Sequence, residues 1–321
     1  MNIYYIILAH KSPEQVFRLV KQLKEPWTQF YIHIDKNVDI NPFLNIFKPV
    51  DNIFFLDGNL REEGTWGDIG IVKATLNALQ QVAKNYKNGY CVLLSGQDYP
   101  IASNLTIKEF FYNKSGIEFI TAYPIPNNIL NEGGLPRINK YKINKSNKRG
   151  HFLFLPTIYE KEFYSLKTAG KLNFLRKGRN FRAMVNIFKL RRFPKYLEPF
   201  AGSQWWALST NMVKEIINFI KVHPDYLHYN KFSLLPDEMF FQSILLHLQK
   251  IDHFQIERSK TYVNWEKTSG PLPVTFELTD FKELKKASKD HLFARKFDID
   301  IDEKILNSID KYLLKNSYEK D

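Results

Sequence analysis

The chain has 321 residues, 44% of them apolar, which is enough to bury a large core in one α/β domain or in two closely packed subdomains. Its single cysteine, Cys91, excludes an intrachain disulfide and a metal cage built from several thiolates. The formal net charge of +12 favours a polyanionic partner, namely a nucleotide diphosphate, an anionic lipid surface or a nucleic acid, with a merely solvated basic surface as the alternative.

Hydropathy and the start of the chain bear on its location. No apolar run approaches the ~18 residues of a transmembrane helix. The first residues, Met1 to Leu8, lack the basic region and the cleavage site of a signal peptide. We therefore expect a cytoplasmic protein.

Strands and helices are predicted to alternate through the first hundred residues. Continuous apolar runs predict buried strands at residues 3–8, 30–34, 52–56 and 90–94, and helical spacing of apolar residues predicts helices at 12–23 and 69–83. Continuous apolar strands joined by helices are typical of parallel sheets covered on both faces. The expected fold class is therefore α/β, with a Rossmann-like, mostly parallel sheet flanked by helices.

The pattern loosens from residue 123 to residue 200, where aromatic and basic residues are scattered without long periodic segments. A strand at 205–208, a helix after Asn211, a helix beginning near Asp237 and a last helix at 302–314 are expected to complete the core. We predict a single domain over residues 1–321. Its parts are a nucleotide-binding half (1–122), an insertion or lid (123–200), and an acceptor and catalytic half (201–321).

Polar residues follow three of the predicted strands. His10, Asp35 and residues 95–98 each come after a strand, at the sheet edge where ligands collect in open parallel sheets. Asp35 is suited to hold a base or ribose there, or simply to cap its own loop. Asp98 is the one carboxylate in its segment, so the segment lacks the two carboxylates of a common metal-binding motif. Without a metal ion, cations from elsewhere in the chain would have to neutralise a departing diphosphate.

Two further segments suggest sugar chemistry. A small, polar and aromatic loop comprises Gly202, Ser203, Gln204, Trp205 and Trp206, and can stack on a sugar ring while hydrogen-bonding its hydroxyls. Acidic residues open a helix some thirty residues later, where Asp237 is the better N-cap and Glu238 the better general base.

Other candidates are basic or aromatic. Arg295 and Lys296 are adjacent cations with apolar residues on both sides, which would restrict their motion as a preorganised electrostatic site requires. The alternative is that they are surface charges flanked by anchoring aromatic residues. Trp66 is as well suited to stack on a ligand as to pack against the helix that follows it.

Together these motifs resemble the core-2/I-branching β-1,6-N-acetylglucosaminyltransferase family, which also contains peptide O-xylosyltransferases and many bacterial members. The resemblance is carried in order by residues 5–10, 32–36, 66–67, 94–100, 202–206, 236–238 and 293–298. Residues 123–200 hold no landmark of the family.

The resemblance implies a GT-A type fold, a UDP-sugar donor, inversion at the anomeric carbon, and catalysis with no metal or other cofactor. By position in the family's motifs, Glu238 would act as base and Lys296 would contact the diphosphate. Asp35 would bind the uracil, with Ala9 and His10 beside it. We group Trp66, Asp98 and Arg295 with these as donor-binding residues, and residues 202–206 as acceptor-binding residues.

One departure concerns the diphosphate. Many relatives have an arginine where this chain has Val274, so either Arg295 or Arg258 substitutes for it, or the chain is a weakened or re-purposed member of the family. The absence of multiple cysteines also separates the chain from secretory-pathway relatives.

The prediction is a metal-independent, inverting transferase that moves N-acetylglucosamine or xylose from a UDP-sugar to a glycan or lipid-linked glycan acceptor in bacterial surface polysaccharide synthesis. Peripheral contact with an anionic membrane, at its inner face, is part of this interpretation, and a nucleic-acid partner is not. A lectin-like glycan-binding protein is the alternative, and a nucleic-acid binder using residues 137–195 is weaker still.

Overall fold

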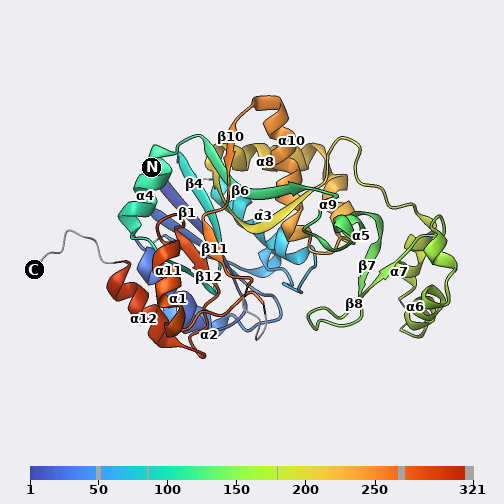
Figure 1. Cartoon of the computed structure of the whole chain (residues 1–321), viewed down its shortest axis with the longest axis horizontal. Helices are drawn as coiled ribbons and strands as arrows, with labels where there is room; N and C mark the ends of the chain where they lie inside the picture. Colours follow the sequence, from blue (N-terminus) through green and yellow to red (C-terminus); the bar gives the residue numbers. More distant parts are fainter. Residues whose placement is uncertain (48–51, 85–86, 179, 267–271, 315–321) are drawn as a thin grey trace, which may run out of the picture.

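The main sheet of the computed structural model, which describes residues 1–47, 52–84, 87–178, 180–266 and 272–314, has seven strands in the order β10-β6-β9-β4-β1-β2-β3 (Figure 1). In chain order these are β1 (Asn2–Ala9), β2 (Thr28–Ile34), β3 (Ile53–Leu56), β4 (Gly89–Ser95), β6 (Ile117–Pro124), β9 (Phe200–Ser209) and β10 (Gln255–Glu257). β9 runs antiparallel to β4 and β6, and the other neighbours pair in parallel. The predicted α/β fold with a mostly parallel sheet is confirmed.

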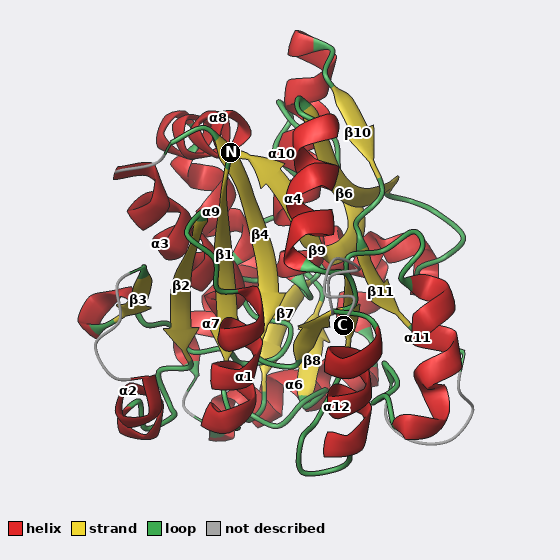
Figure 2. Cartoon of the chain, turned by 90° about the vertical axis from the view of Figure 1, so that its left-hand side faces the viewer, coloured by secondary structure: helices red, strands yellow, loops and turns green. Residues whose placement is uncertain are grey.

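Helices cover both faces of this sheet (Figure 2). One face packs on α1 (Pro13–Leu23), α2 (Asn41–Phe47), α4 (Asn104–Asn113), α11 (Phe281–Ala287) and α12 (Glu303–Tyr312), and the other on α3 (Gly70–Lys84), α8 (Thr210–Val222), α9 (Pro224–Asn230) and α10 (Phe240–Asp252). Alternation along β1 explains the two cores, because Ile3 and Tyr5 enter one while Tyr4 and Ile6 enter the other. Both faces need apolar side chains, which is why the strand is apolar throughout.

The strands and helices predicted in the first hundred residues agree with the structure to within two residues at each end. The predicted strand at 205–208 is the end of the longer β9, and the last helix is α12. One element is corrected: the helix expected near Asp237 begins at Phe240, after a 3-10 turn at Pro236–Glu238. Short strands such as β10 were missed because three residues give too little periodicity to detect.

The chain between β6 and β9 leaves the sheet and forms a separate body at one end of the molecule (Figure 1). It contains α5 (Leu135–Asn139), the antiparallel hairpin β7 (Tyr141–Asn144) and β8 (Phe152–Leu155), α6 (Leu166–Lys177) and α7 (Phe181–Val185). A small core including Tyr141, Leu155, Leu175 and Ile187 holds it together. We call residues 125–199 the insertion.

A second, small sheet lies at the edge of the main one. It consists of β11 (Thr261–Val263), β12 (Phe293–Arg295) and β5 (Asp98–Pro100), with β12 antiparallel to β5. This pairing places Arg295 opposite Asp98, although the two are almost two hundred residues apart in sequence. Residues from both ends of the chain therefore meet where the parallel strands end.

Candidate active site

The loops after β1, β2 and β4 lie side by side, as the sequence predicted. The Asp35 N–H donates to the Ala9 carbonyl at 2.9 Å, and the Gly96 N–H donates to the Leu8 carbonyl at 2.9 Å. The His10 side chain lies near Asp35 and Arg295, and burial lowers its pKa. The edge that collects ligands in parallel sheets therefore brings together Ala9, His10 and Asp35.

The carboxylate of Asp35 holds two turns together. Its Oδ1 accepts from the Asn37 N–H at 2.8 Å, and its Oδ2 accepts from the Gly64 N–H at 2.8 Å. This is the loop-capping role weighed above, and it fixes the segment leading to Trp66. A contact between Asp35 and a nucleotide base stays a prediction.

Asp98 is fully buried below this edge. Its Oδ2 accepts from the Ser95 N–H at 2.6 Å, and its Oδ1 lies 3.4 Å from Nη1 of Arg295. Burial raises the pKa of Asp98, while the Arg295 cation acts in the opposite direction. The assignment of Asp98 as a donor-binding residue is therefore corrected: its carboxylate holds a cation that itself lies nearer the site.

The two tryptophans do not form an open sugar shelf. Trp206 is 2% exposed and packs 5.3 Å from the ring of Phe241, and Trp205 is buried with the Arg295 guanidinium 4.1 Å above its ring. The acceptor-shelf prediction is corrected for both side chains, because β9 is an inner strand covered on both faces. Trp205 instead supports Arg295 by a cation–π contact.

The residues before the tryptophans are partly structural as well. A Cβ on Gly202 would lie 1.8 Å from the Thr121 carbonyl oxygen, where the pairing of β6 with β9 shifts register, so only glycine fits. The Ser203 carbonyl accepts from Gln242 Nε2 at 2.7 Å. Gln204 is half-buried, and its role as an acceptor-binding residue stays a prediction.

Glu238 and Asp237 have different surroundings. Glu238 Oε2 pairs with Nη1 of Arg137 at 2.8 Å, and burial raises the pKa of Glu238 against the opposing effect of that cation. Asp237 lies in the 3-10 turn, so it is not the N-cap that the sequence suggested; the cap of α10 is Met239. Glu238 is half-exposed and oriented by an arginine, as a general base requires.

Asp237 is expected to make stability depend on pH. Within the described ranges its buried Oδ1 has no hydrogen-bond partner, and burial together with the Glu238 charge raises the pKa of Asp237 to about 7. The folded state thus keeps a proton that the unfolded chain loses near its ordinary pKa of 3.8, and stability falls as the pH rises from there through 7.

Asp237→Asn imitates the protonated carboxyl and should raise the free energy of unfolding at pH 8 by about 1–3 kcal/mol, with a smaller gain at pH 5. Thermal unfolding of both proteins at the two pH values checks this. Equal gains at both values would contradict the assignment.

The insertion covers the loop that carries Trp66. Arg149 lies 5.3 Å from the Trp66 ring centroid, and the ring of Phe152 lies 6.4 Å from it. Two residues on, Asp68 accepts from Lys142 Nζ and Asn144 Nδ2, each at 2.5 Å. Trp66 therefore contacts the insertion, and a stacking contact with the donor stays a prediction.

Cations converge on the end of β12. Burial lowers the pKa of Lys296, and the nearby charges of Arg149, Arg295 and Lys11 lower it further. Arg149 Nη2 also donates to the Leu272 carbonyl at 3.3 Å, two residues before Val274. Val274 itself is buried in the core. Arg149 is thus a further candidate for the second charge, in addition to Arg295 and Arg258.

Sequence reasoning missed Arg137 and Arg149 because both lie in a stretch without periodicity or landmarks. Their basic character was visible in the sequence, but many neighbouring lysines and arginines share it. Only the pairing of Arg137 with Glu238 and the contact of Arg149 with Leu272 separate them from the rest.

Comparison with known proteins shows the family of this chain. The family model described as Core-2/I-Branching enzyme matches residues 3–287. The chain belongs to the core-2/I-branching enzyme family. The match ends before Arg295 and Lys296, so those two residues rest on the sequence motif and the geometry given above.

Curated relatives are distant and longer. Xylosyltransferase 1 of Rattus norvegicus is 21% identical over 341 residues, covering 98% of this chain and 36% of that protein. Xylosyltransferase 2 of Homo sapiens is 20% identical over 335 residues, covering 98% of this chain and 34% of that protein. The chain therefore spans about a third of the length of these relatives.

A solved structure of 4-diphosphocytidyl-2C-methyl-D-erythritol synthase from Anaerococcus prevotii has 12% identity and a TM-score of 0.35, and covers 90% of this chain and 95% of that one. A TM-score this low does not establish a shared fold. The fold of this family member is therefore described from its own strands and helices.

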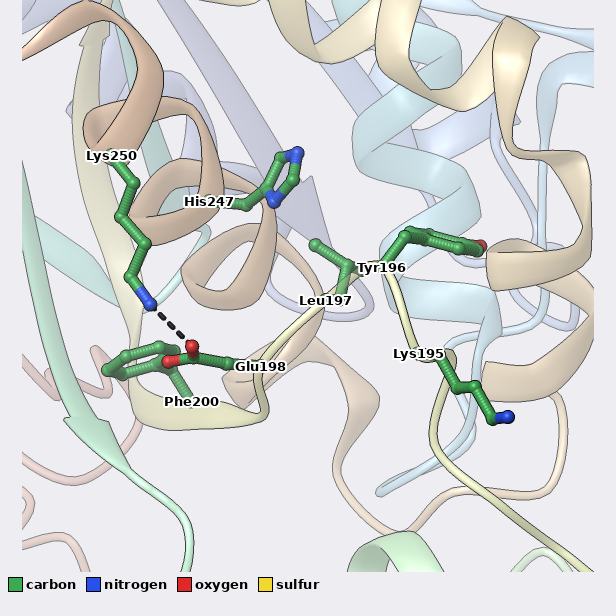
Figure 3. A pocket seen from close by; sticks show the side chains of 7 residues that line it. All are labelled: Lys195, Tyr196, Leu197, Glu198, Phe200, His247 and Lys250. Atoms are coloured by element: carbon green, nitrogen blue, oxygen red, sulfur yellow. Dashed lines mark ion pairs between the residues drawn. The ribbon is translucent and has the colours of Figure 1, made fainter.

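A separate hollow of about 110 Å³ lies between the segment before β9 and the end of α10 (Figure 3). It is lined by Lys195, Tyr196, Leu197, Glu198, Phe200, His247 and Lys250. A 2.6 Å ion pair of Glu198 with Lys250 links two walls of the hollow. The hollow shares no residue with the candidate site. Over the part of the chain that the structure describes, no three His, Cys, Asp or Glu side chains gather in a group able to hold a metal ion.

Proposed function

We propose that this family member is an inverting glycosyltransferase that moves N-acetylglucosamine or xylose from a UDP-sugar to a glycan hydroxyl. The observation that carries the proposal is the Glu238 carboxylate, which is paired with Arg137 and whose neighbour Asp237 lies near the Arg295 cation at the end of β12. Relatives named xylosyltransferases support xylose among the two donor sugars. The setting would be bacterial surface polysaccharide synthesis.

In this mechanism Glu238 takes the proton of the acceptor hydroxyl, and that oxygen attacks C1 of the donor sugar. The bond from C1 to the UDP oxygen breaks, and its electron pair leaves with the diphosphate. Arg137 orients Glu238, while Lys296, Arg295 and Arg149 stabilise the developing negative charge. We propose that these cations do the work of a divalent ion, so that no metal or other cofactor is needed.

Calorimetry of UDP, UDP-N-acetylglucosamine and UDP-xylose, first with EDTA and then with manganese, tests the donor site. One UDP-sugar should bind equally well in both buffers. Lys296→Ala should weaken binding about tenfold to a hundredfold, because a charge-assisted hydrogen bond is lost, and Arg149→Ala about threefold to tenfold.

Lys148→Ala, next to Arg149 in sequence and also exposed, is the matched control and should bind as the parent does. Binding that appears only with manganese would overturn the metal-independent mechanism. Binding that ignores both Lys296→Ala and Arg149→Ala would place the diphosphate elsewhere.

We propose a glycan or lipid-linked glycan as acceptor, with peripheral contact between the protein and the inner face of an anionic membrane. The excess of basic residues supports this contact. Among the described helices, none is long and apolar enough to cross a bilayer. The lectin-like alternative is less well supported, because the two tryptophans that would shelve a sugar are buried.

A further inference from the structure

The far end of the insertion exposes an unusual amount of apolar surface. Eight of the 20 large apolar side chains that are exposed in the described ranges lie between residues 159 and 190. The most exposed are Leu166 (92%) and Tyr164 (77%), beside the start of α6. α6 and α7 form the tip of the molecule furthest from the sheet (Figure 1), so this surface is separate from the candidate site.

Part of this surface is an ordered ridge on α7 and the turn after it. Phe181, Val185 and Phe188 follow one another at helical spacing and are 58%, 55% and 61% exposed. The opposite side of the same segment, with Ala183 and Ile187, packs into the small core of the insertion. The ridge is therefore not needed to hold the insertion together, and it faces outward on a supported helix.

The segment that carries the ridge is basic. From residue 163 to residue 192 the sequence has nine lysines and arginines and no aspartate or glutamate. Lys177, Lys189 and Arg192 are exposed. Arg191 is the exception, because its guanidinium is buried 4.2 Å from the ring of Tyr229 and donates to Ser233.

We infer that this tip, formed by α6, α7 and residues 186–192, is the surface through which the protein binds an anionic lipid membrane. An apolar ridge flanked by lysines and arginines matches both layers of such an interface, since the rings enter the acyl boundary while the cations meet the headgroups. A second copy of this chain would bring two basic tips together, and a nucleic acid would use the cations but leave the rings exposed.

The inference rests on the membrane contact proposed above and assigns it a surface. The two ends of the insertion would then have different roles. The near end carries Arg137 and Arg149 to the candidate site, and the far end would hold that site close to a lipid-linked acceptor.

Sedimentation with vesicles tests the surface. The full chain is mixed with vesicles of phosphatidylcholine alone and of phosphatidylcholine with phosphatidylglycerol in equal parts. We expect binding to the second kind only. Phe181→Ser/Phe188→Ser should weaken that binding by about tenfold or more, since two apolar anchors are lost.

Val222→Ser/Ile251→Ser removes two side chains of similar exposure on α8 and α10, and it should bind as the parent does. Circular dichroism and thermal unfolding confirm that both double variants fold. Lys177→Glu/Lys189→Glu keeps the ridge and should also weaken binding to the anionic vesicles, more at low salt than at high salt.

No binding to anionic vesicles would overturn both the membrane contact and this surface, but it would leave the transferase proposal to be judged by nucleotide binding. Binding that neither the serine nor the glutamate variant weakens would overturn the surface alone. Loss of self-association in the serine variant, seen by analytical ultracentrifugation without vesicles, would show that a second copy covers the ridge and would overturn the inference.

Discussion

Glu238→Gln is expected to lower the rate of sugar transfer by about 10²–10⁴-fold while leaving UDP binding nearly unchanged. Glutamine keeps the size of the side chain and can still accept a hydrogen bond from Arg137, but it cannot take up a proton from the acceptor. The loss should therefore appear in kcat, measured with the donor sugar that calorimetry identifies.

Glu215→Gln is the matched control, because Glu215 is exposed on α8, away from the site. It should transfer sugar at the parental rate. A parallel loss of transfer and of UDP binding in Glu238→Gln would show that Glu238 serves donor binding and not proton transfer. Sugar binding without any transfer in the parent, unaffected by the same change, would favour the lectin-like alternative.

Asp98→Asn is expected to lower the free energy of unfolding by about 3–5 kcal/mol, because it leaves the Arg295 cation buried without its carboxylate. Asparagine can still accept from the Ser95 N–H, so the change isolates the charge. A loss of this size is a large fraction of the 5–15 kcal/mol that stabilises a typical protein, so denaturant unfolding should resolve it.

The double variant Asp98→Asn/Arg295→Met separates a pair effect from a general one. Removing both charges should recover part of the stability lost in Asp98→Asn, as expected for residues in direct contact. Asp252→Asn, at the exposed end of α10, should change stability little. Additive effects in the double variant would contradict the interpretation of Asp98 and Arg295 as a coupled pair.

The sheet and its ligand-binding edge could be predicted from the sequence because their signals are local. A strand buried on both faces must be apolar at every position, and residues 3–8 and 90–94 show this directly. Once parallel strands are expected, chain connectivity alone places His10 and Asp35 at one edge. The family motifs added Glu238 and Lys296, and the structure places Lys296 beside Arg295 and Lys11 at this edge.

The errors concern side chains whose surroundings come from distant parts of the chain. Trp205 and Trp206 look like a binding loop in sequence, but β9 is an inner strand, and helices and Arg295 cover the two rings. Asp98 looks like a ligand-facing carboxylate until β12 pairs with β5 and places a buried cation beside it. No local pattern encodes which of these residues is buried.

The sequence by itself determined the α/β class, the positions of the first four main-sheet strands along the chain, the family and the sheet edge at which His10 and Asp35 lie. These follow from hydrophobic periodicity and from motifs, which are properties of short segments. Only the tertiary structure decided which cation pairs with Glu238, that Arg149 contacts the Leu272 carbonyl near Val274, and which aromatic rings are open to solvent. The physical reason is that charge pairing and burial depend on contacts between segments far apart in the chain, and those contacts exist only after the insertion has packed against the sheet.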